Sequence, residues 1–328
     1  MPTVKTRTHR FRGTLAVTRR RLSVGVTAVA VLSLAGCQAE NPGNEGGNAR
    51  GGGPTGDASV GGSAAELVAV AHENVLIDLW ADGTAAFGIF VPNERPPTAE
   101  QRRGGERPAP VYTREGGERL AQNPLYDFLF LNLEGGYNVE AVQAIAEGLR
   151  SPSAVSRKTL LVRIPPIERD GEAVTRTRIG EILAAGADGV VLPHVRNAEE
   201  ARAAVSFFSD AGADVWSPSN PTGEILAMIM IEDPGALAAV AEIADTPGYS
   251  ILACGIGSLT GALGGDREAA EAGNQEVLSH AKRIGVADMI TANARDIEAR
   301  VQEGFLALLM QGSGADETIL IGRAAAGR

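Results

Sequence analysis

Short apolar runs alternate with amphipathic stretches from about residue 64 to the end of the chain. Eight runs of four to seven mostly apolar residues have the length and composition of buried strands. They are Ala86–Val91, Tyr126–Leu131, Thr159–Arg163, Gly189–Leu192, Ile225–Ile231, Ser250–Cys254, Asp288–Thr291 and Phe305–Met310. Strands that alternate with helices pair in parallel through crossover connections. The pattern therefore predicts an α/β protein with a (βα)8 TIM barrel over residues 64–328, and a doubly wound open sheet is the alternative.

Helical periodicity separates the apolar runs. Leu237, Val240 and Ile243 recur at the spacing of one helix face, and Pro234 suits a first helical turn. Helical spacing is found in Ala64–His72, Val139–Leu149, Arg176–Ala185, Glu199–Ser209, Ala236–Ile243, Ala269–Arg283 and Arg295–Glu303. One segment breaks the repeat, because Pro92–Asn123 carries five prolines and follows the first strand. In a barrel it would lie over the mouth, either as a lid or as a surface insertion without a function.

Residues 1–36 have the composition of a signal peptide. They contain seven lysines and arginines and no acid, and the apolar run over residues 24–34 is shorter than the roughly 20 residues that span a bilayer. Leu34–Cys37 looks like a lipobox, in which the cysteine of a bacterial lipoprotein becomes the acylated first residue. We therefore expect an exported protein that is lipid-anchored to the cell envelope through Cys37. Two alternatives stay open: an ordinary Cys37 beside an ordinary cleavage site, and a twin-arginine signal at Arg19–Arg21.

Residues 37–63 are rich in Gly, Asn, Pro and Ser, so they cannot bury enough apolar surface to fold and are expected to form a flexible tether. The whole chain has a net charge of −10, and removal of the leader leaves 23 basic residues against 40 acidic ones. An acidic chain with 4% aromatic residues and no basic stripe is not expected to bind nucleic acid. Cys254 is the only cysteine besides Cys37, which excludes a cysteine-based metal site and indicates a small core residue.

Polar residues and glycines gather where the predicted strands end. Barrel enzymes draw their reacting groups from these carboxyl ends. Carboxylates there suit a hard cation, a guanidinium matches two oxygens of an anion, and an imidazole suits proton transfer. From the second strand to the seventh, the candidate residues are Asn132, Glu134, Arg163, His194, Glu232, Asp233, Gly255, Gly257, Ser258 and Asn293.

From about residue 74 to 311 the chain resembles the HpcH/HpaI aldolase and citrate lyase family of pyruvate-enolate barrels. Residues 126–134 (YDFLFLNLE) are similar to a family strand that ends D-x-E-H, and residues 161–165 (LVRIP) match its V-R-x-P strand. Residues 185–193 (AGADGVVLP) match the pattern G-A-x-G-(I/V)-x-x-P, and Glu232 matches a metal-binding glutamate. The chain departs from the family where Asn132 stands for the acid and Gly135 for the histidine of D-x-E-H. It departs again where Ser258 replaces the metal-binding aspartate of the loop G-P-x-D-L-S.

The resemblance implies a carbon-carbon lyase of the aldolase type that acts on a 2-oxo acid through a metal-stabilised enolate. On this interpretation Arg163 and Glu134 are catalytic residues, and Arg163 also holds the oxo acid. His194 lies outside the family motif, but its place after the fourth strand makes it a further catalytic candidate. Glu232 and Asp233 would bind Mg²⁺ or Mn²⁺.

The same interpretation makes Gly255, Gly257 and Ser258 substrate contacts. Family members often form trimers or hexamers, and the sequence leaves open whether this chain does so. The departures from the family pattern support a second hypothesis, a non-catalytic, lipid-anchored envelope protein that binds an oxo acid or has a structural role. In that case Arg163 and Glu232 form only an ion pair inside the barrel, and His194 is structural.

Overall fold

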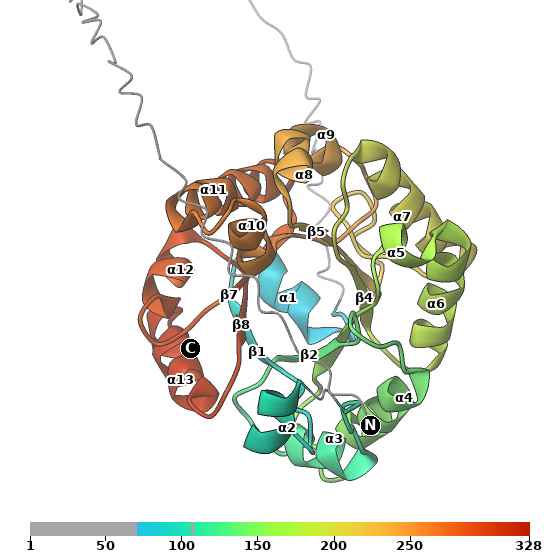
Figure 1. The fold of residues 1–328 in the computed structure, drawn as a ribbon, viewed down its shortest axis with the longest axis vertical. Coiled ribbons are helices and arrows are strands. Elements are labelled where there is room, and N and C mark those ends of the chain that lie inside the picture. The colour runs from blue at the N-terminus through green and yellow to red at the C-terminus, as the bar shows by residue number, and fades with distance from the viewer. Residues whose placement is uncertain (1–70, 106–107) are drawn as a thin grey trace, which may run out of the picture. The chain divides into compact units, whose positions relative to one another are not determined.

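The computed structural model describes residues 71–105 and 108–328, and its strands form one closed parallel barrel (Figure 1). Each strand pairs with the next, and the ring closes where Ala86 of the first strand lies opposite Ala307 of the last. The strands are β1 (Ala86–Phe90), β2 (Phe128–Asn132), β3 (Thr159–Arg163), β4 (Gly189–Leu192), β5 (Leu226–Ile231), β6 (Ile251–Cys254), β7 (Ala287–Thr291) and β8 (Ala307–Met310). The predicted (βα)8 barrel is confirmed, and the open sheet is excluded.

The described residues also form helices, most of which surround the barrel (Figure 1). They are α1 (Val75–Ala81), α2 (Ala99–Gly104), α3 (Arg114–Ala121), α4 (Val139–Leu149), α5 (Ile167–Asp170), α6 (Glu172–Ala184), α7 (Ala198–Asp210), α8 (Pro234–Ala238), α9 (Val240–Ala244), α10 (Ile256–Ala262), α11 (Arg267–Ile284), α12 (Ile297–Glu303) and α13 (Ala315–Ala325). Two predictions need correction. The helix expected over residues 236–243 is interrupted at Ala239, and most of the expected glycine loop is the first turn of α10. No helix in the described part of the chain is long and apolar enough to cross a membrane.

Alternation along the strands decides which side chains enter the barrel. In β3, Leu160 and Val162 pack outward in the core between sheet and helices, whereas Leu161 packs inward. Successive strand residues point to opposite faces, so Arg163 at the end of β3 points inward as well. The same alternation in β5 places Met228, Met230 and then Glu232 on the inner side.

Helix α1 closes the end of the barrel at which the strands begin. Leu76, Ile77 and Trp80 of α1 belong to the interior core, and the view down the barrel shows α1 across its centre (Figure 1). Asn74 caps the helix by accepting a hydrogen bond from the N–H of Leu76. The helix expected over 64–72 lies mostly outside the described residues, and residues 71 and 72 are not helical. The signal peptide, Cys37 and the tether also lie outside the described residues.

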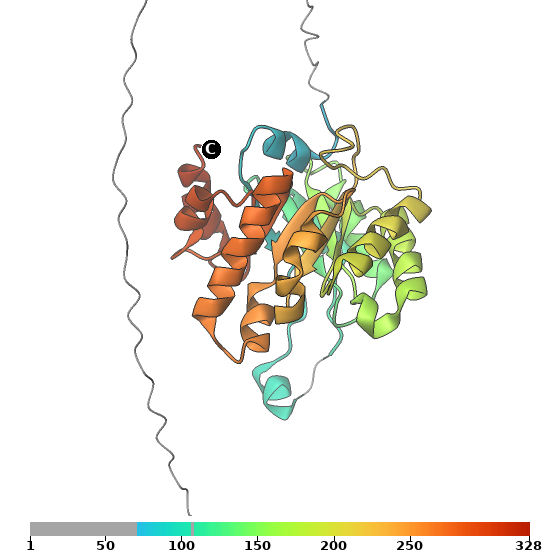
Figure 2. The same cartoon turned by 90° about the horizontal axis from the view of Figure 1, so that it is seen from above.

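The proline-rich segment Pro92–Asn123 contains two helices. Helix α3 is the crossover helix after β1 and packs closely on α4. Glycines allow this approach, since a Cβ at Gly148 would lie only 2.7 Å from the Cα of Gly117. Helix α2 starts at Thr98 with a capping box and projects beyond the end of the barrel opposite α1 (Figure 2). The described residues of this segment therefore place a helix at the mouth, and the role of the segment as a lid stays a prediction.

Candidate active site

Arg163 and Glu232 form a bifurcated ion pair in the barrel mouth. Nη2 of Arg163 donates to both carboxylate oxygens of Glu232, at 3.0 and 2.9 Å, and lies 3.0 Å from Oε2 of Glu134. Glu232 is only 1% exposed, so its charge requires a partner, and the guanidinium provides one that is always protonated. The end of β3 and the segments after β2 and β5 thus meet as the sequence predicts.

His194 brings an imidazole to the same two carboxylates. Its Nε2 lies 3.2 Å from Oε1 of Glu134 and 3.6 Å from Oε2 of Glu232, and its backbone N–H donates to Glu232 at 3.0 Å. Its φ of 53° lies in the left-handed region, which histidine tolerates better than most residues. Contacts of both the ring and the backbone with the carboxylates hold the residue in this conformation.

The cluster changes the acidity of its members. The hydrogen bond to Glu134 raises the pKa of His194, and burial partly opposes this effect. The same hydrogen bond, with the charge of Arg163, lowers the pKa of Glu134 although burial raises it. Two carboxylates are therefore matched by one guanidinium and, when His194 is protonated, by one imidazolium.

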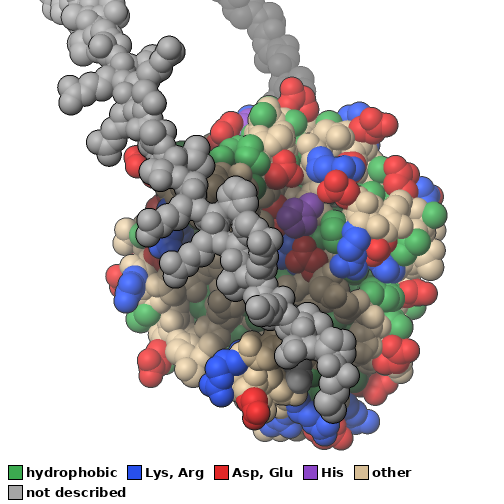
Figure 3. Space-filling view, viewed as in Figure 1, with side chains coloured by type: hydrophobic (Ala, Val, Ile, Leu, Met, Phe, Trp, Pro, Cys, Tyr) green, Lys and Arg blue, Asp and Glu red, His purple; other side chains and the backbone are tan. Residues whose placement is uncertain are grey.

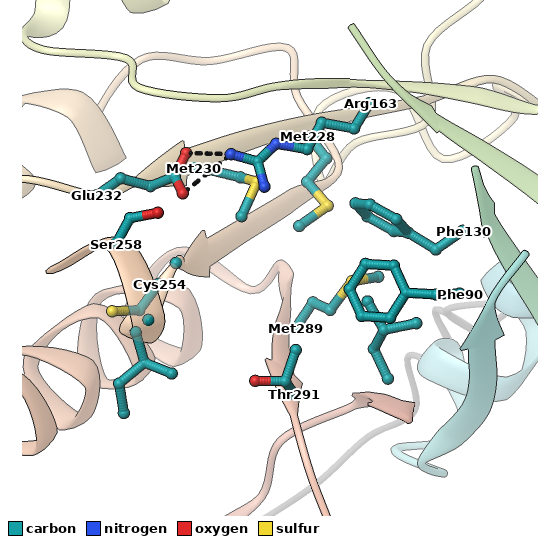
Figure 4. A pocket seen from close by; sticks show the side chains of 14 residues that line it. Phe90, Phe130, Arg163, Met228, Met230, Glu232, Cys254, Ser258, Met289 and Thr291 are labelled. Atoms are coloured by element: carbon teal, nitrogen blue, oxygen red, sulfur yellow. Dashed lines mark hydrogen bonds and ion pairs between the residues drawn. The ribbon is translucent and has the colours of Figure 1, made fainter. Parts of the chain in front are cut away.

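A cavity of about 190 Å³ opens beside this cluster (Figure 4). Arg163, Glu232 and Ser258 form its polar wall, and Figure 4 shows Ser258 on the same side as Glu232. The remaining wall is largely apolar and consists of Phe90, Phe130, Met228, Met230, Cys254, Ile256, Met289 and Leu309 with Gly255, Gly257 and Thr291. In the space-filling view of this face, a histidine lies beside acidic side chains in a hollow (Figure 3).

Nε of Arg163 is buried and has no hydrogen-bond partner among the described residues. A buried donor without an acceptor is costly, and the great majority of such groups in folded proteins are paired. Because Arg163 lines the cavity, an anionic group bound there would find a guanidinium that still has an unused donor.

The predicted metal ligands do not converge. One oxygen of Asp233 accepts from the N–H groups of Gly235 and Ala236, so this side chain caps α8 instead of joining Glu232. Within residues 71–105 and 108–328, no three His, Cys, Asp or Glu side chains are grouped as metal ligands. Ser258 offers only a hydroxyl, and Glu232 already accepts from Arg163 and His194. A divalent cation requires several oxygen ligands with negative charge, and the residues present do not fit it.

The other candidates are not members of the charged cluster, although the amide oxygen of Asn132 accepts a hydrogen bond from the N–H of Glu134. Asn132 and Gly135 line a second cavity of about 560 Å³ together with Pro108, Pro110 and Tyr112 of the proline-rich segment. Asn293 pairs with Asp296 at the start of α12. Cys254 is 4% exposed and packs in the hydrophobic core, which confirms a core residue, and burial raises the pKa of its thiol to about 12.

Sequence reasoning missed Arg169 and the apolar wall of the cavity. Nη1 of Arg169 donates to the backbone oxygen of Glu134 at 2.7 Å and thereby holds the loop that carries this glutamate. No motif marks Arg169, because its contact depends on the turn between β3 and α5. The wall was detectable in principle, since Met228, Met230 and Met289 all alternate with outward-facing residues.

Comparison with known proteins agrees with this architecture. The HpcH/HpaI aldolase/citrate lyase family model matches residues 120–321. An HpcH/HpaI aldolase from Desulfitobacterium hafniense DCB-2 is 20% identical (TM-score 0.54) over 76% of this chain and 95% of its own. A family protein from Burkholderia cenocepacia J2315 is 20% identical (TM-score 0.55) over 77% of this chain and 98% of its own. Citrate synthase SbnG is 19% identical (TM-score 0.55) over 77% of this chain and 96% of its own.

These three structural likenesses concern the fold, because the sequence identities are low. Comparison with curated protein sequences gives no match. The family model, in contrast, covers more than half of the chain, including every strand from β2 to β8. The chain therefore belongs to the HpcH/HpaI aldolase/citrate lyase family.

Proposed function

We propose that the barrel mouth binds a 2-oxo acid on Arg163 and breaks or forms the carbon-carbon bond between C3 and C4, where C3 is the carbon next to its keto group. The observation that carries this proposal is that Arg163 lines a cavity while its buried Nε has no hydrogen-bond partner among the residues that the structure describes. A guanidinium with a free donor matches the carboxylate and keto oxygens of an oxo acid. The hypothesis also agrees with membership of a family that contains aldolases and citrate lyases.

The reaction requires a positive charge and a proton carrier. In cleavage of a 4-hydroxy-2-oxo acid, a base removes the hydroxyl proton, the C3–C4 bond breaks, and its electron pair forms the enolate of the oxo acid. The aldehyde leaves, and the enolate takes up a proton at C3. Arg163 would neutralise the enolate oxygen in a site from which water is partly excluded.

His194 is the proposed proton carrier. Glu134 faces Nε2 and therefore favours the tautomer with the proton on this nitrogen, which leaves Nδ1 to accept the hydroxyl proton and return it to C3. No step in this scheme depends on a metal. The metal-stabilised form that the family resemblance implies would need further ligands, because Glu232 is already occupied by Arg163.

Exchange of the C3 protons of pyruvate in D₂O, followed by NMR, tests the proposal. We expect exchange in the parent protein with EDTA present and slower exchange in His194→Asn. Pyruvate binding should be weaker in Arg163→Lys, because the ammonium of lysine lacks the forked donors of a guanidinium. The assay is repeated with Mn²⁺ to test whether a metal is required. Absence of both binding and exchange, with and without Mn²⁺, would overturn the lyase proposal.

A non-catalytic barrel is the second candidate. It is favoured by the fact that Arg163 already satisfies Glu134 and Glu232, because such an ion pair is stable without a ligand. Oxo-acid binding without proton exchange would support this candidate. A trimer or hexamer stays a prediction, which sedimentation velocity can test.

A further inference from the structure

Three aspartates lie near the N-terminal ends of strands, and two of them are fully paired. Asp127 precedes β2 and accepts from the N–H of Phe87 and from the guanidinium groups of Arg323 and Arg328. Asp188 precedes β4 and is paired in the same way, with the N–H of Leu160 and the guanidinium groups of Arg150 and Arg157. Each of these buried carboxylates thus accepts hydrogen bonds from the guanidinium groups of two arginines.

The third aspartate, Asp288 in β7, has no such partners. It is 2% exposed, and neither of its carboxylate oxygens has a hydrogen-bond partner among the described residues. Its neighbours Ala287 and Met289 pack inside the barrel, so Asp288 points outward between β7 and the surrounding helices. Burial raises the pKa of Asp288 well above its usual range, and the positive charge of Lys282 only partly opposes this effect.

Asp288 lines a cavity of about 260 Å³ at the end of the barrel opposite the mouth. The cavity is also lined by Trp80 and Trp216, the only tryptophans of the chain, whose ring centroids are 6.1 Å apart. Nε1 of Trp80 donates to the backbone oxygen of Leu306, so this indole is fixed in place. Among the described residues that line the cavity, Lys282 is the only other charged one, and its ammonium donates to the backbone oxygen of Glu303.

We propose that this cavity binds a small organic cation, an alkylammonium or guanidinium group, with its N–H donors on Asp288 and its charge near the two indoles. The cation would give Asp288 the N–H donors and the positive charge that arginines give to Asp127 and Asp188. Indole rings attract cations through their faces, and a desolvated carboxylate without a partner gains strongly from a charged donor. The site is independent of the oxo-acid reaction proposed for the mouth.

Tryptophan fluorescence is a selective probe, because both tryptophans line the cavity. We expect n-butylammonium to produce a saturable change in the emission of the parent protein, and 1-butanol, its neutral counterpart, to produce none. Asp288→Asn keeps the shape of the side chain but removes its charge, and it should weaken butylammonium binding by about tenfold or more. Lys282→Met removes a repelling charge and should tighten binding.

Control variants keep the inference falsifiable. Glu134→Gln alters a carboxylate of the mouth and should leave the butylammonium titration unchanged. Equal affinity in Asp288→Asn and the parent protein would overturn the proposal, as would an equal response to 1-butanol, which would indicate an apolar cavity only. A parent protein without any saturable change would overturn it as well.

Discussion

Gly255 lies directly against the carboxylate of Glu232. A Cβ added to Gly255 would be 2.3 Å from Oε1 of Glu232 and 2.5 Å from its Cγ, closer than real side chains approach one another. Glycine at this position therefore allows the buried carboxylate to stand between the end of β6 and Arg163. The start of α10 thus helps to position the ion pair without contributing a charge of its own.

We expect Gly255→Ala to lower the free energy of unfolding by about 1–3 kcal/mol, because Glu232 must move to make room. Gly257→Ala is the matched control: no atom lies within 4 Å of the added methyl group, and alanine favours the helix by about 0.5–1 kcal/mol. Urea denaturation of both variants tests this prediction. Equal stability of the two variants would contradict the close contact.

Removal of the Arg163 side chain should show how strongly an unpaired buried carboxylate lowers the free energy of unfolding. Arg163→Met leaves Glu232 without its main partner, and we expect a loss of about 3–5 kcal/mol in unfolding free energy. The double variant Arg163→Met/Glu232→Gln should recover a substantial part of this loss, because no buried charge remains. A double variant as unstable as the single one would show that the guanidinium acts through packing instead.

The stability contribution of His194 should depend on pH. Its pKa is raised from the usual 6.5, so the contribution is fully present below about pH 6.5 and is lost as pH rises through the folded-state pKa. The parent protein should therefore exceed His194→Asn in stability most clearly near pH 6, with the difference shrinking above it. Asparagine tolerates the left-handed backbone, so the comparison isolates the charge.

Glu134→Gln should reduce this pH dependence, because the hydrogen bond to Glu134 is the largest cause of the raised pKa of His194, whereas the charge of Glu232 remains. Urea denaturation between about pH 5.5 and 9 measures both variants. The range stays above the lowered pKa of Glu134, whose own contribution is lost only as pH falls through that value. A difference that grows with pH would contradict the assignment.

Ser258→Asp should create affinity for Mn²⁺. The substitution adds a carboxylate on the side of the cavity where Glu232 lies, and affinity for such cations rises with the charge of the ligands. We expect titration calorimetry to show binding at least about tenfold tighter than in the parent protein. Ser258→Asn adds an oxygen without charge and should bind no tighter than the parent.

The proposed lipid anchor can be tested by cell fractionation. Cys37→Ser removes the acylation site that the leader predicts, so the protein should move from the membrane fraction to the soluble exported fraction. Full retention of Cys37→Ser in the membrane fraction would contradict lipid attachment at this residue.

The sequence was most informative where an apolar run has sharp polar borders. Thr159–Arg163 and Gly189–Leu192 have the predicted bounds, because charge or proline limits them on either side. The helix Val75–Ala81 was missed, although Asn74 is a recognisable N-cap. The start of α10 was missed because glycines at residues 255 and 257 favour a loop, whereas packing of Leu259 favours the helix.

Within the site, local sequence identified the residues but not their contacts. Strand ends predict that Arg163 and Glu232 meet, since both point into one barrel. The direction of Asp233 depends on capping of α8, and the position of His194 depends on a left-handed backbone, so neither could be read from spacing. Asp288 looked like one polar residue in a strand, and only the folded chain shows that it lacks the arginines of its counterparts.

The closure of β1 on β8 has a consequence for synthesis of the chain. Ala86 finds its partner Ala307 only after almost the whole barrel has been made, whereas β2 to β7 can pair with neighbours as they emerge. Until then one edge of β1 exposes unpaired backbone groups to other nascent chains. A truncated chain that ends before β8 would keep this edge open permanently, so premature termination should yield aggregates and not a smaller barrel.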